Sequence, residues 1–306
     1  MTMSTQLFFN SAVDRMGTQQ GRVNELQTQI ATGKQVVKPS DAPDQATVIS
    51  RLRSAVNRQE GFDRALTAIE NRLTAEETAL DSMQSSLIRI QELAIQGAND
   101  TNGPQDREAL ATEIEGLVDH MMGLANTQDV SGNYVFAGSD SKTRPYERID
   151  GDIVYQGDDV TSQIFVSEQQ MLNLNRPGSK MFPPIAHATD AGDDNKRSFF
   201  GALGDLVSSM RGNDYDGIHQ GMSDVTDMID AVSKSLATVG TDLTVVESRK
   251  EVLNDVKLRY QTLLSDAQDL DYSKAITDLS AEMLTLEAAQ SAFAKISGQS
   301  LFDYIR

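Results

Sequence analysis

Histidines are the side chains available for general acid–base chemistry near neutral pH, and acidic side chains are the other candidates for binding a metal. The chain contains no cysteine. That absence excludes disulfides, thiolate metal sites and a thiol nucleophile together. The three histidines are His120, His187 and His219, and no two of them have the spacing of a metal-binding pair. His120 lies one residue beyond the apolar face of a predicted helix, so we interpret it as a packing residue.

Two loops come closest to binding a ligand. Gly33-Lys34-Gln35 lacks the upstream glycine and the Ser/Thr of a phosphate-binding loop. Residues 190–195 (DAGDDN) could attract calcium, but they lack the residue order of an EF-hand and its distal glutamate. We therefore predict a solvated acidic loop there, with no catalytic residue, no metal site and no cofactor. The chain is not predicted to be an enzyme.

Charge and hydropathy restrict the partners. The 306 residues include 27 Lys and Arg against 45 Asp and Glu, a formal net charge of −18. Such a surface repels phosphate, which argues against nucleic acid and anionic membranes as partners. No apolar run approaches 18 residues, so no membrane insertion is expected. Residues 1–10 lack the basic and apolar parts of a cleaved signal, so any export is expected to occur without one.

Proline and apolar spacing predict long helices. All seven prolines fall between Pro39 and Pro184, which leaves residues 44–103 and the chain after 184 free of helix breakers. An N-cap, a proline and an acid at residues 41–44 mark one helix start, and Pro104 marks another. Apolar residues at alternating spacings of three and four then continue for many turns, as in a coiled coil.

The apolar faces of these helices predict a bundle core. Its members come from the helices after residue 44, after Pro104 and after residue 214, and they are Leu66, Ile69, Leu73, Leu80, Met83, Leu87, Ile90, Leu110, Ile114, Leu117, Val232, Leu236, Val239, Leu243 and Val246.

The middle of the chain is predicted to be β-rich. Residues 134–137 (YVFA), 153–155 (IVY) and 163–166 (QIFV) are short runs of strand-forming residues separated by turn residues. Asp150-Gly151 predicts a tight hairpin. Residues 175–195 are rich in proline, glycine and acid and are predicted to be loop.

Both ends of the chain are predicted to form amphipathic helices. The predicted bundle core is complete without them, so their apolar faces need another partner. We predict that they pack against each other and against neighbouring copies, through an assembly interface of Leu7, Val13, Met16, Val23, Leu26, Ile30, Ile276, Leu279, Met283, Leu286, Phe293, Ile296, Leu301, Phe302 and Ile305.

The expected fold is mainly α, a long antiparallel coiled-coil or helical bundle built from N- and C-terminal segments with a small inserted β-rich domain. Its expected parts are a terminal assembly domain (1–43 with 268–306), a bundle domain (44–130 with 214–267) and an outer β domain (131–213). Such a chain could be a structural subunit that polymerises through its ends. It could also be a helical sensor, or a pore-forming or adhesive protein that uses the bundle as a lever.

Three separated motifs narrow this choice. Residues 30–34 (IATGK) with 38–43 (KPSDAP), residues 87–99 (LIRIQELAIQGAN) and residues 265–272 (SDAQDLDY) resemble signatures of the bacterial flagellin superfamily, in the same order. Residues 4–9 (STQLFF), 133–138 (NYVFAG) and 294–305 (AKISGQSLFDYI) are more similar to the superfamily's hook–filament junction branch than to flagellin.

This resemblance implies a structural subunit that is exported unfolded and self-associates in a ring between hook and filament. It implies four partners, namely other copies of the chain, the first hook-associated protein on the hook side, flagellin on the filament side and a flagellar export chaperone. The alternatives that stay open are a minor flagellin and, more remotely, a non-flagellar helical surface or sensor protein.

Overall fold

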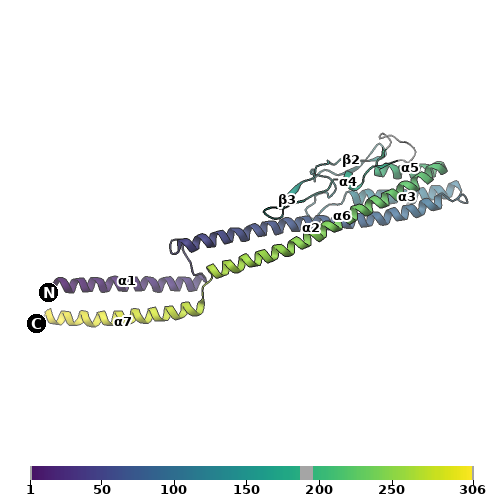
Figure 1. Cartoon of the computed structure of the whole chain (residues 1–306). Helices are drawn as coiled ribbons and strands as arrows, with labels where there is room; N and C mark the ends of the chain where they lie inside the picture. The colour runs from purple at the N-terminus through teal and green to yellow at the C-terminus, as the bar shows by residue number, and fades with distance from the viewer. Residues whose placement is uncertain (1, 187–195, 305–306) are drawn as a thin grey trace. The chain divides into compact units, whose positions relative to one another are not determined.

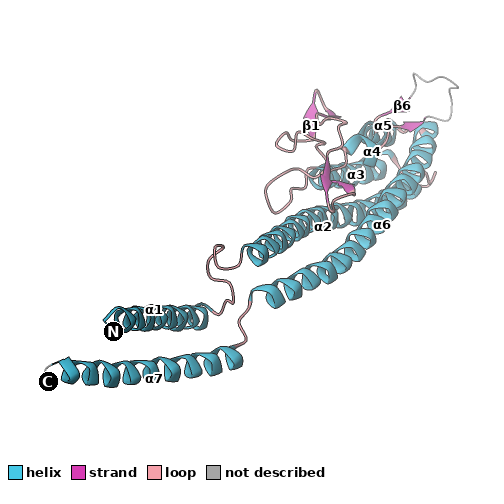
Figure 2. Ribbon diagram, turned by 60° about the vertical axis from the view of Figure 1, so that its left-hand side comes forward, coloured by secondary structure: helices cyan, strands magenta, loops and turns pink. Residues whose placement is uncertain are grey.

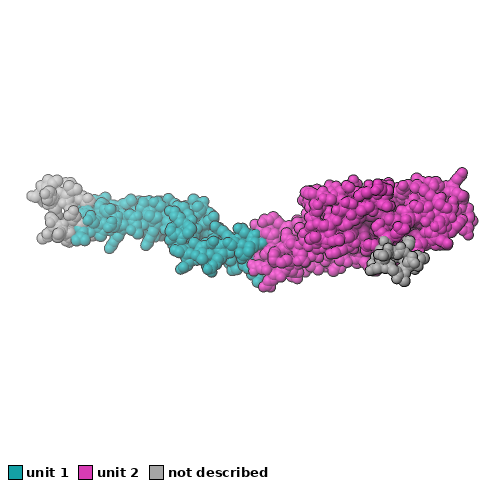
Figure 3. All heavy atoms as spheres, turned by 90° about the horizontal axis from the view of Figure 1, so that it is seen from above, with its two compact units in different colours: residues 1–58, 255–306 teal, residues 59–254 magenta. Residues whose placement is uncertain are grey.

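A computed structural model describes residues 2–186 and 196–304 of the chain. It divides into two compact units, unit 1 with residues 1–58 and 255–306, and unit 2 with residues 59–254 (Figure 3). Unit 1 therefore combines segments from both ends of the chain, and unit 2 is the continuous stretch between them.

Long helices dominate, as the sequence predicts (Figure 1). They are α1 (Thr2–Thr32), α2 (Pro43–Gly97), α3 (Pro104–Ala125), α5 (Phe199–Gly212), α6 (Tyr215–Gln268) and α7 (Tyr272–Tyr304), with a single turn α4 (Gly178–Met181). Proline occupies the first position of α2 and of α3, where its missing N–H costs no hydrogen bond. The predicted mainly-α fold with a small strand region is confirmed.

In unit 2, α2 and α6 run antiparallel. Side chains meet between them at Glu70–Lys250 (2.6 Å), Gln84–Ser233 (2.9 Å) and Gln91–Thr226 (3.0 Å). Each helix buries residues at seven-residue intervals, which places one face of each helix on the core. These residues are Leu66, Leu73, Leu80 and Leu87 in α2 and Val225, Val232, Val239 and Val246 in α6.

The structure corrects the interpretation of two segments in the middle of the chain. Residues 199–212, assigned to the β-rich domain, form α5, which packs against α3. The Ser198 hydroxyl caps α5 by accepting the N–H of Gly201 (3.1 Å), and Asn213 ends it in the left-handed conformation. Residues 134–137 are not a strand, although Val135, Phe136 and Ala137 are fully buried.

The strands form antiparallel pairs of two (Figure 2). They are β1 (Tyr146–Ile149) with β2 (Asp152–Tyr155), β3 (Gln163–Phe165) with β4 (Met171–Asn173), and β5 (Ile185–Ala186) with β6 (Lys196–Arg197). Asp150 and Gly151 join β1 to β2 with φ of 52° and 99°, as a type I′ turn requires, so the predicted hairpin is confirmed. The segment predicted as loop over 175–195 contains α4 and β5.

Candidate assembly surface and buried polar contacts

The two terminal helices, α1 and α7, pack together as an antiparallel pair within unit 1. Phe9 and Phe293 meet edge to face with their ring centroids 5.5 Å apart. Val23 is buried, with 4% of its surface exposed, and most other contacts along the pair are half-buried. From the predicted interface, the inward residues of this pair are Met16, Val23, Leu26, Ile30, Leu279, Leu286 and Phe293.

Backbone hydrogen bonds join the segment between α1 and α2 to the end of α6 and the segment between α6 and α7. The N–H of Gln35 donates to Gln268 O (2.8 Å), and the N–H of Leu270 donates to Gly33 O (3.0 Å). Gly33 has a φ of 68°, and a Cβ there would lie 2.8 Å from the hydroxyl of Tyr272. The recognised motif at 30–34 thus contains a glycine that the turn requires.

A second set of apolar residues on the same two helices is largely exposed, and of these Ile296 also lines the groove described below. Leu7 is 71% exposed, and Val13, Ile276, Met283 and Ile296 are each between 41% and 53% exposed. Leu284, which the sequence analysis missed, is 68% exposed beside Met283. The side chains of Leu301 and Phe302, and Ile305 as a whole, lie outside the described residues.

A groove of about 680 Å³ runs between α1 and α7. Its lining combines small and apolar side chains with polar and charged ones, and consists of Ser11, Ala12, Asp14, Arg15, Met16, Thr18, Gln19, Arg22, Thr285, Ala289, Ala292, Phe293 and Ile296. Unit 1 therefore presents a groove with a mixed apolar and polar lining and, separately, exposed apolar side chains.

The predicted bundle core residues lie together in unit 2. Eleven of the fifteen are buried, and Leu110, Leu117, Leu236 and Leu243 are half-buried against the same core. In α3 the buried face centres on Ala111, Ile114, Val118 and Met121 instead, because this helix packs on α5 as well.

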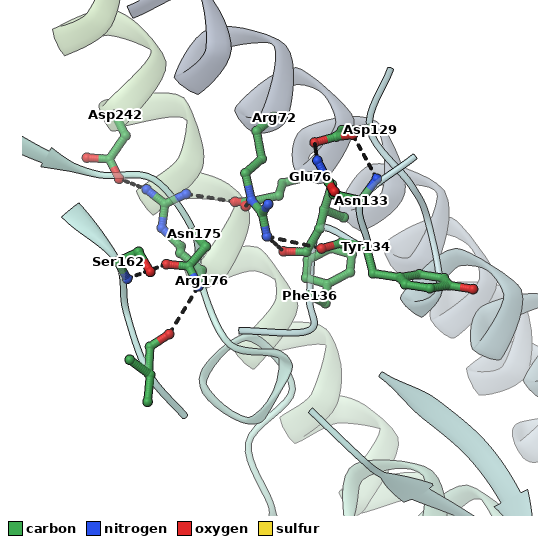
Figure 4. A network of polar contacts seen from close by, with 12 residues as sticks. Arg72, Glu76, Asp129, Asn133, Tyr134, Phe136, Ser162, Asn175, Arg176 and Asp242 are labelled. Atoms are coloured by element: carbon green, nitrogen blue, oxygen red, sulfur yellow. Dashed lines mark hydrogen bonds and ion pairs between the residues drawn. The ribbon is translucent and has the colours of Figure 1, made fainter. Parts of the chain in front are cut away.

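Several charged side chains are buried in unit 2, and two of them, Arg72 and Glu76, lie one turn apart on α2. Glu76 of α2 is fully buried, and its carboxylate accepts a hydrogen bond from Arg176 at 2.7 Å (Figure 4). The other end of the same guanidinium contacts Asp242 of α6. Arg72, one turn before Glu76, lies 3.5 Å from its carboxylate and donates to the carbonyl oxygens of Tyr134 and Val135. Sequence reasoning gave no signal for this cluster beyond a single acid on an apolar face.

Burial acts on both charges of the pair in α2. Loss of solvent raises the pKa of the Glu76 carboxyl, and Arg176 and Arg72 oppose that rise. Loss of solvent likewise lowers the pKa of the Arg72 guanidinium, against the pull of Glu76. Burying the charges of Glu76 and Arg72 therefore costs free energy of hydration, and the attraction between the paired charges offsets that cost.

A second buried arginine, Arg107 of α3, has carbonyl and aromatic partners. It donates to Gly97 O (2.8 Å), Asn99 O (3.1 Å) and the hydroxyl of Tyr215 (2.8 Å), and its guanidinium carbon lies 4.4 Å from the Tyr215 ring centroid. Gly97 is the last residue of α2, where a helix leaves acceptors unpaired and carries partial negative charge, and Asn99 follows it by two residues. Arg107 thus joins α2, α3 and the start of α6.

The side chains considered first for chemistry are not gathered. His120 and His219 are exposed on different helices, and His187 and residues 190–195 lie outside the described residues. Within residues 2–186 and 196–304, no group of three or more His, Asp or Glu is arranged to hold a metal ion. In that same part of the chain, no helix is long and apolar enough to cross a membrane.

Comparison with known sequences supports the predicted resemblance. Residues 3–141 match the model of the bacterial flagellin N-terminal helical region. Flagellar hook-associated protein 3 of Escherichia coli K12 is 27% identical over 316 residues, which is 99% of this chain and 99% of that protein. A flagellin of Clostridium tyrobutyricum is 25% identical over only 45% of this chain and 37% of its own length.

Solved structures share the fold. A putative flagellar hook-associated protein from Vibrio parahaemolyticus superposes with a TM-score of 0.66 at 18% identity, covering 75% of this chain and all of that one. The resemblance to the flagellin superfamily, and within it to hook-associated proteins, is confirmed.

Proposed function

We propose that this chain, which is similar from end to end to flagellar hook-associated protein 3 and carries the flagellin N-terminal helical region, is a structural subunit of the bacterial flagellum at the junction of hook and filament. The observation that carries the proposal is the difference in coverage. The hook-associated relative aligns over 99% of both chains, whereas the flagellin aligns over less than half of either. The alternative of a minor flagellin accounts for less than half of the chain.

Self-association through unit 1 is the proposed mechanism of assembly. The exposed residues Ile276, Met283 and Leu284 project from α7, and the groove between α1 and α7 supplies a different, partly apolar surface. When such a projection of one copy enters the groove of the next, the contact is head-to-tail and continues into a ring or helical array. Burial of each apolar side chain contributes about 1.5–3 kcal/mol.

The proposed organisation has three parts, with the terminal assembly domain at 1–43 and 268–306, the bundle at 44–130 and 214–267, and the outer domain at 131–213. The first hook-associated protein and flagellin are the proposed neighbours on either side of the ring. Export is proposed to occur without a cleaved signal peptide and with an export chaperone. No catalytic activity is proposed.

Location on the flagellum tests the function directly. Gold-labelled antibody against the chain, applied to isolated hook–basal-body–filament preparations, is expected to mark a single band where the hook meets the filament. Label along the whole filament identifies a minor flagellin instead and contradicts the proposal. Cells lacking the gene are expected to carry hooks without filaments.

The assembly surface is tested by placing charge on it. Met283→Asp with Leu284→Asp is expected to leave the thermal melt of the monomer and its appearance in the medium unchanged, because both side chains are exposed. It is expected to abolish filament growth in cells lacking the native gene, because charge cannot be desolvated in an apolar contact.

A matched control makes the same kind of change elsewhere. Val130 and Val160 are 89% and 56% exposed in unit 2, and Val130→Asp with Val160→Asp is expected to restore filaments. Normal filaments from the Met283/Leu284 variant, or an equal defect in the control, would rule out this surface while leaving the junction function open.

A further inference from the structure

The apolar contacts between α2 and α6 repeat in steps of seven residues and so define their axial alignment poorly. Buried leucines stand at 66, 73, 80 and 87 of α2, and buried valines stand at 225, 232, 239 and 246 of α6. A slide of seven residues, about 10 Å along a helix, therefore replaces leucine with leucine and valine with valine over most of the contact.

The polar contacts between these helices repeat in the same way. Gln84 and Gln91 are seven residues apart, as are their partners Ser233 and Thr226. Lys250 binds Glu70, and a slide in either direction brings it to Asp63 or Glu77, which are also acidic. A slide therefore keeps the Lys250 ion pair and one of the two glutamine pairs, since Gln91 then meets Ser233 or Gln84 meets Thr226.

Two contacts do not repeat in this way. Arg107 of α3 binds Gly97 at the end of α2 and Tyr215 at the start of α6, and in the middle of the two helices the heptad pattern is broken by Glu76. It occupies the position that Ile69, Met83 and Ile90 occupy in the neighbouring heptads, and it is fully buried. Its partner Arg176 binds it at 2.7 Å and binds Asp242 of α6 as well, so one guanidinium joins both helices at a single level (Figure 4).

A slide of seven residues breaks one of these two contacts of Arg176. If Arg176 stays with Asp242, Ile69 or Met83 replaces Glu76 opposite it and Glu76 is buried without that partner; if Arg176 stays with Glu76, Ser235 or Arg249 replaces Asp242.

The loop that carries Arg176 is itself fixed. The side chain of Asn175, which is 4% exposed, donates to Val160 O (3.0 Å) and accepts the N–H of Ser162. Arg72 holds the 134–135 backbone to α2 beside the same cluster. On the other side, the Ser235 hydroxyl of α6 donates to Met181 O (3.1 Å), so the segment that carries Arg176 is attached to both helices.

We propose that Glu76, Arg176 and Asp242 form a register lock, which selects one axial alignment of α2 against α6 among alignments that the apolar contacts accept almost equally. Buried polar groups have this role in coiled coils, where they set alignment at a cost in stability. The lock keeps the two longest helices from sliding by one heptad, independently of whether the chain acts at the hook–filament junction.

The absence of cysteine allows alignment to be read by crosslinking in the full-length chain. Gln84→Cys with Ser233→Cys, the native pair, reports the alignment of the structure. Gln91→Cys with Ser233→Cys, the slid pair, reports a slide of seven residues. Both pairs are treated with a short thiol-to-thiol crosslinker, and the rate of intramolecular product is measured by mass spectrometry.

In the otherwise unchanged chain, the native pair is expected to react and the slid pair to remain nearly unreacted. With Glu76→Leu, the slid pair is expected to react at least tenfold faster. The matched control is Lys250→Leu, which removes the Glu70 ion pair between the same helices and is expected to leave the slid pair unreacted.

An unchanged rate for the slid pair in Glu76→Leu overturns the lock, and so does an equal increase in Lys250→Leu. If Glu76→Leu loses its helical circular dichroism, Arg176→Met replaces it in the test, because methionine keeps a long side chain but carries no charge. The slid pair is then expected to react at least tenfold faster in Arg176→Met than in the otherwise unchanged chain. Loss of helix in both variants also overturns the proposal, because the cluster is then required for the fold itself and does not choose between alignments.

Discussion

At the scale of single residues, side-chain hydrogen bonds fix the backbone of loops in the middle of the chain, where the backbone is neither helix nor strand. Asp158 accepts the backbone N–H of Ser139 (2.7 Å), the Ser139 hydroxyl and the N–H of Val160 (3.1 Å). The N–H of Asp158 in turn donates to Ala137 O (3.1 Å). Two loops that are distant in sequence are thereby joined beside the buried residues 135–137.

Gly138 is the residue that permits this approach. Its φ is 79°, and a Cβ there would lie 2.3 Å from the carbonyl oxygen of Asp158. Gly138→Ala is therefore expected to destabilise the chain by more than about 2 kcal/mol, from backbone strain and steric overlap together. Gly132 has a φ of 71° with no atom within 4 Å of the added Cβ, so Gly132→Ala isolates the strain and is expected to cost about 1 kcal/mol. Urea unfolding measures the free energy of unfolding of both variants. An equal loss in the two would contradict the steric overlap between the added Cβ at position 138 and Asp158.

The same contact predicts a dependence on pH. Hydrogen bonds from the Ser139 hydroxyl and N–H lower the pKa of the Asp158 carboxyl below its ordinary value near 3.9. The native state therefore binds that proton less readily than the unfolded chain. The contribution to stability is present above pH 4 and is lost as the pH falls through the lowered pKa.

Melting temperatures measured from pH 7 to pH 3 test this sign. Asp158→Asn is expected to melt below the native chain at pH 7, and the difference is expected to shrink as the pH falls. Ser139→Ala removes the hydroxyl donor and is expected to show a smaller difference with the same trend. A difference that stays constant over this range contradicts the assignment.

Residues of this kind mark the limit of sequence reasoning. The turn at Asp150-Gly151 was predictable because the two residue types alone favour a positive φ. Residues 134–137 favour a strand locally, but Arg72 binds the carbonyls of Tyr134 and Val135 from 62 and 63 residues away. The partner of Glu76 is 100 residues distant, so the sequence around Glu76 shows an acid on an apolar face and gives no sign of Arg176.

At the scale of elements, the long helices were predictable because caps, prolines and apolar spacing agree over many turns. Helix α5 carries the same signals in Ser198, Phe199, Leu203 and Leu206, yet its surroundings are aromatic and rich in turns, and that composition favours strands. The apolar residues of α1 and α7 were predictable from their spacing, except for the exposed Leu284, which lies outside the predicted stripe. Their division into an inward and an outward face depends on how the two helices pack.

Packing of α5 on α6 predicts opposite effects for two glycines of α6. An added Cβ at Gly221 would lie 2.7 Å from Leu206 Cδ1 and 2.9 Å from Leu206 Cβ, whereas one at Gly240 meets no atom within 4 Å. Gly221→Ala is expected to destabilise by about 1–3 kcal/mol through overpacking. Gly240→Ala is expected to stabilise by about 0.5–1 kcal/mol, because alanine is the better helix former.

Thermal and urea unfolding of the two variants measure this difference in sign. Two changes of the same sign would contradict the close approach of α5 to α6 at Gly221.

At the scale of the whole molecule, charge is divided unequally between the units. Residues 1–58 and 255–306 hold 12 Lys and Arg against 12 Asp and Glu, whereas residues 59–254 hold 15 against 33. Unit 1 is therefore neutral overall, and unit 2 carries the entire net charge of −18. A neutral unit can be packed densely among copies, and a charged one resists close approach.

This division predicts that ionic strength controls self-association. Between about 10 mM and 150 mM NaCl the Debye length falls from about 30 Å to about 8 Å, so repulsion between the units 2 of adjacent copies is screened. The concentration at which the full-length chain associates, measured by light scattering, is expected to fall over this range and to change little above it. Asp81→Asn with Asp150→Asn and Asp152→Asn removes three exposed charges from unit 2 and is expected to lower that concentration most at 10 mM.

Sodium sulfate at equal ionic strength separates screening from a salt effect on apolar contacts, which depends on the anion. Association that weakens as NaCl rises would show that attraction between charges, and not apolar contact between neutral units, holds the copies together.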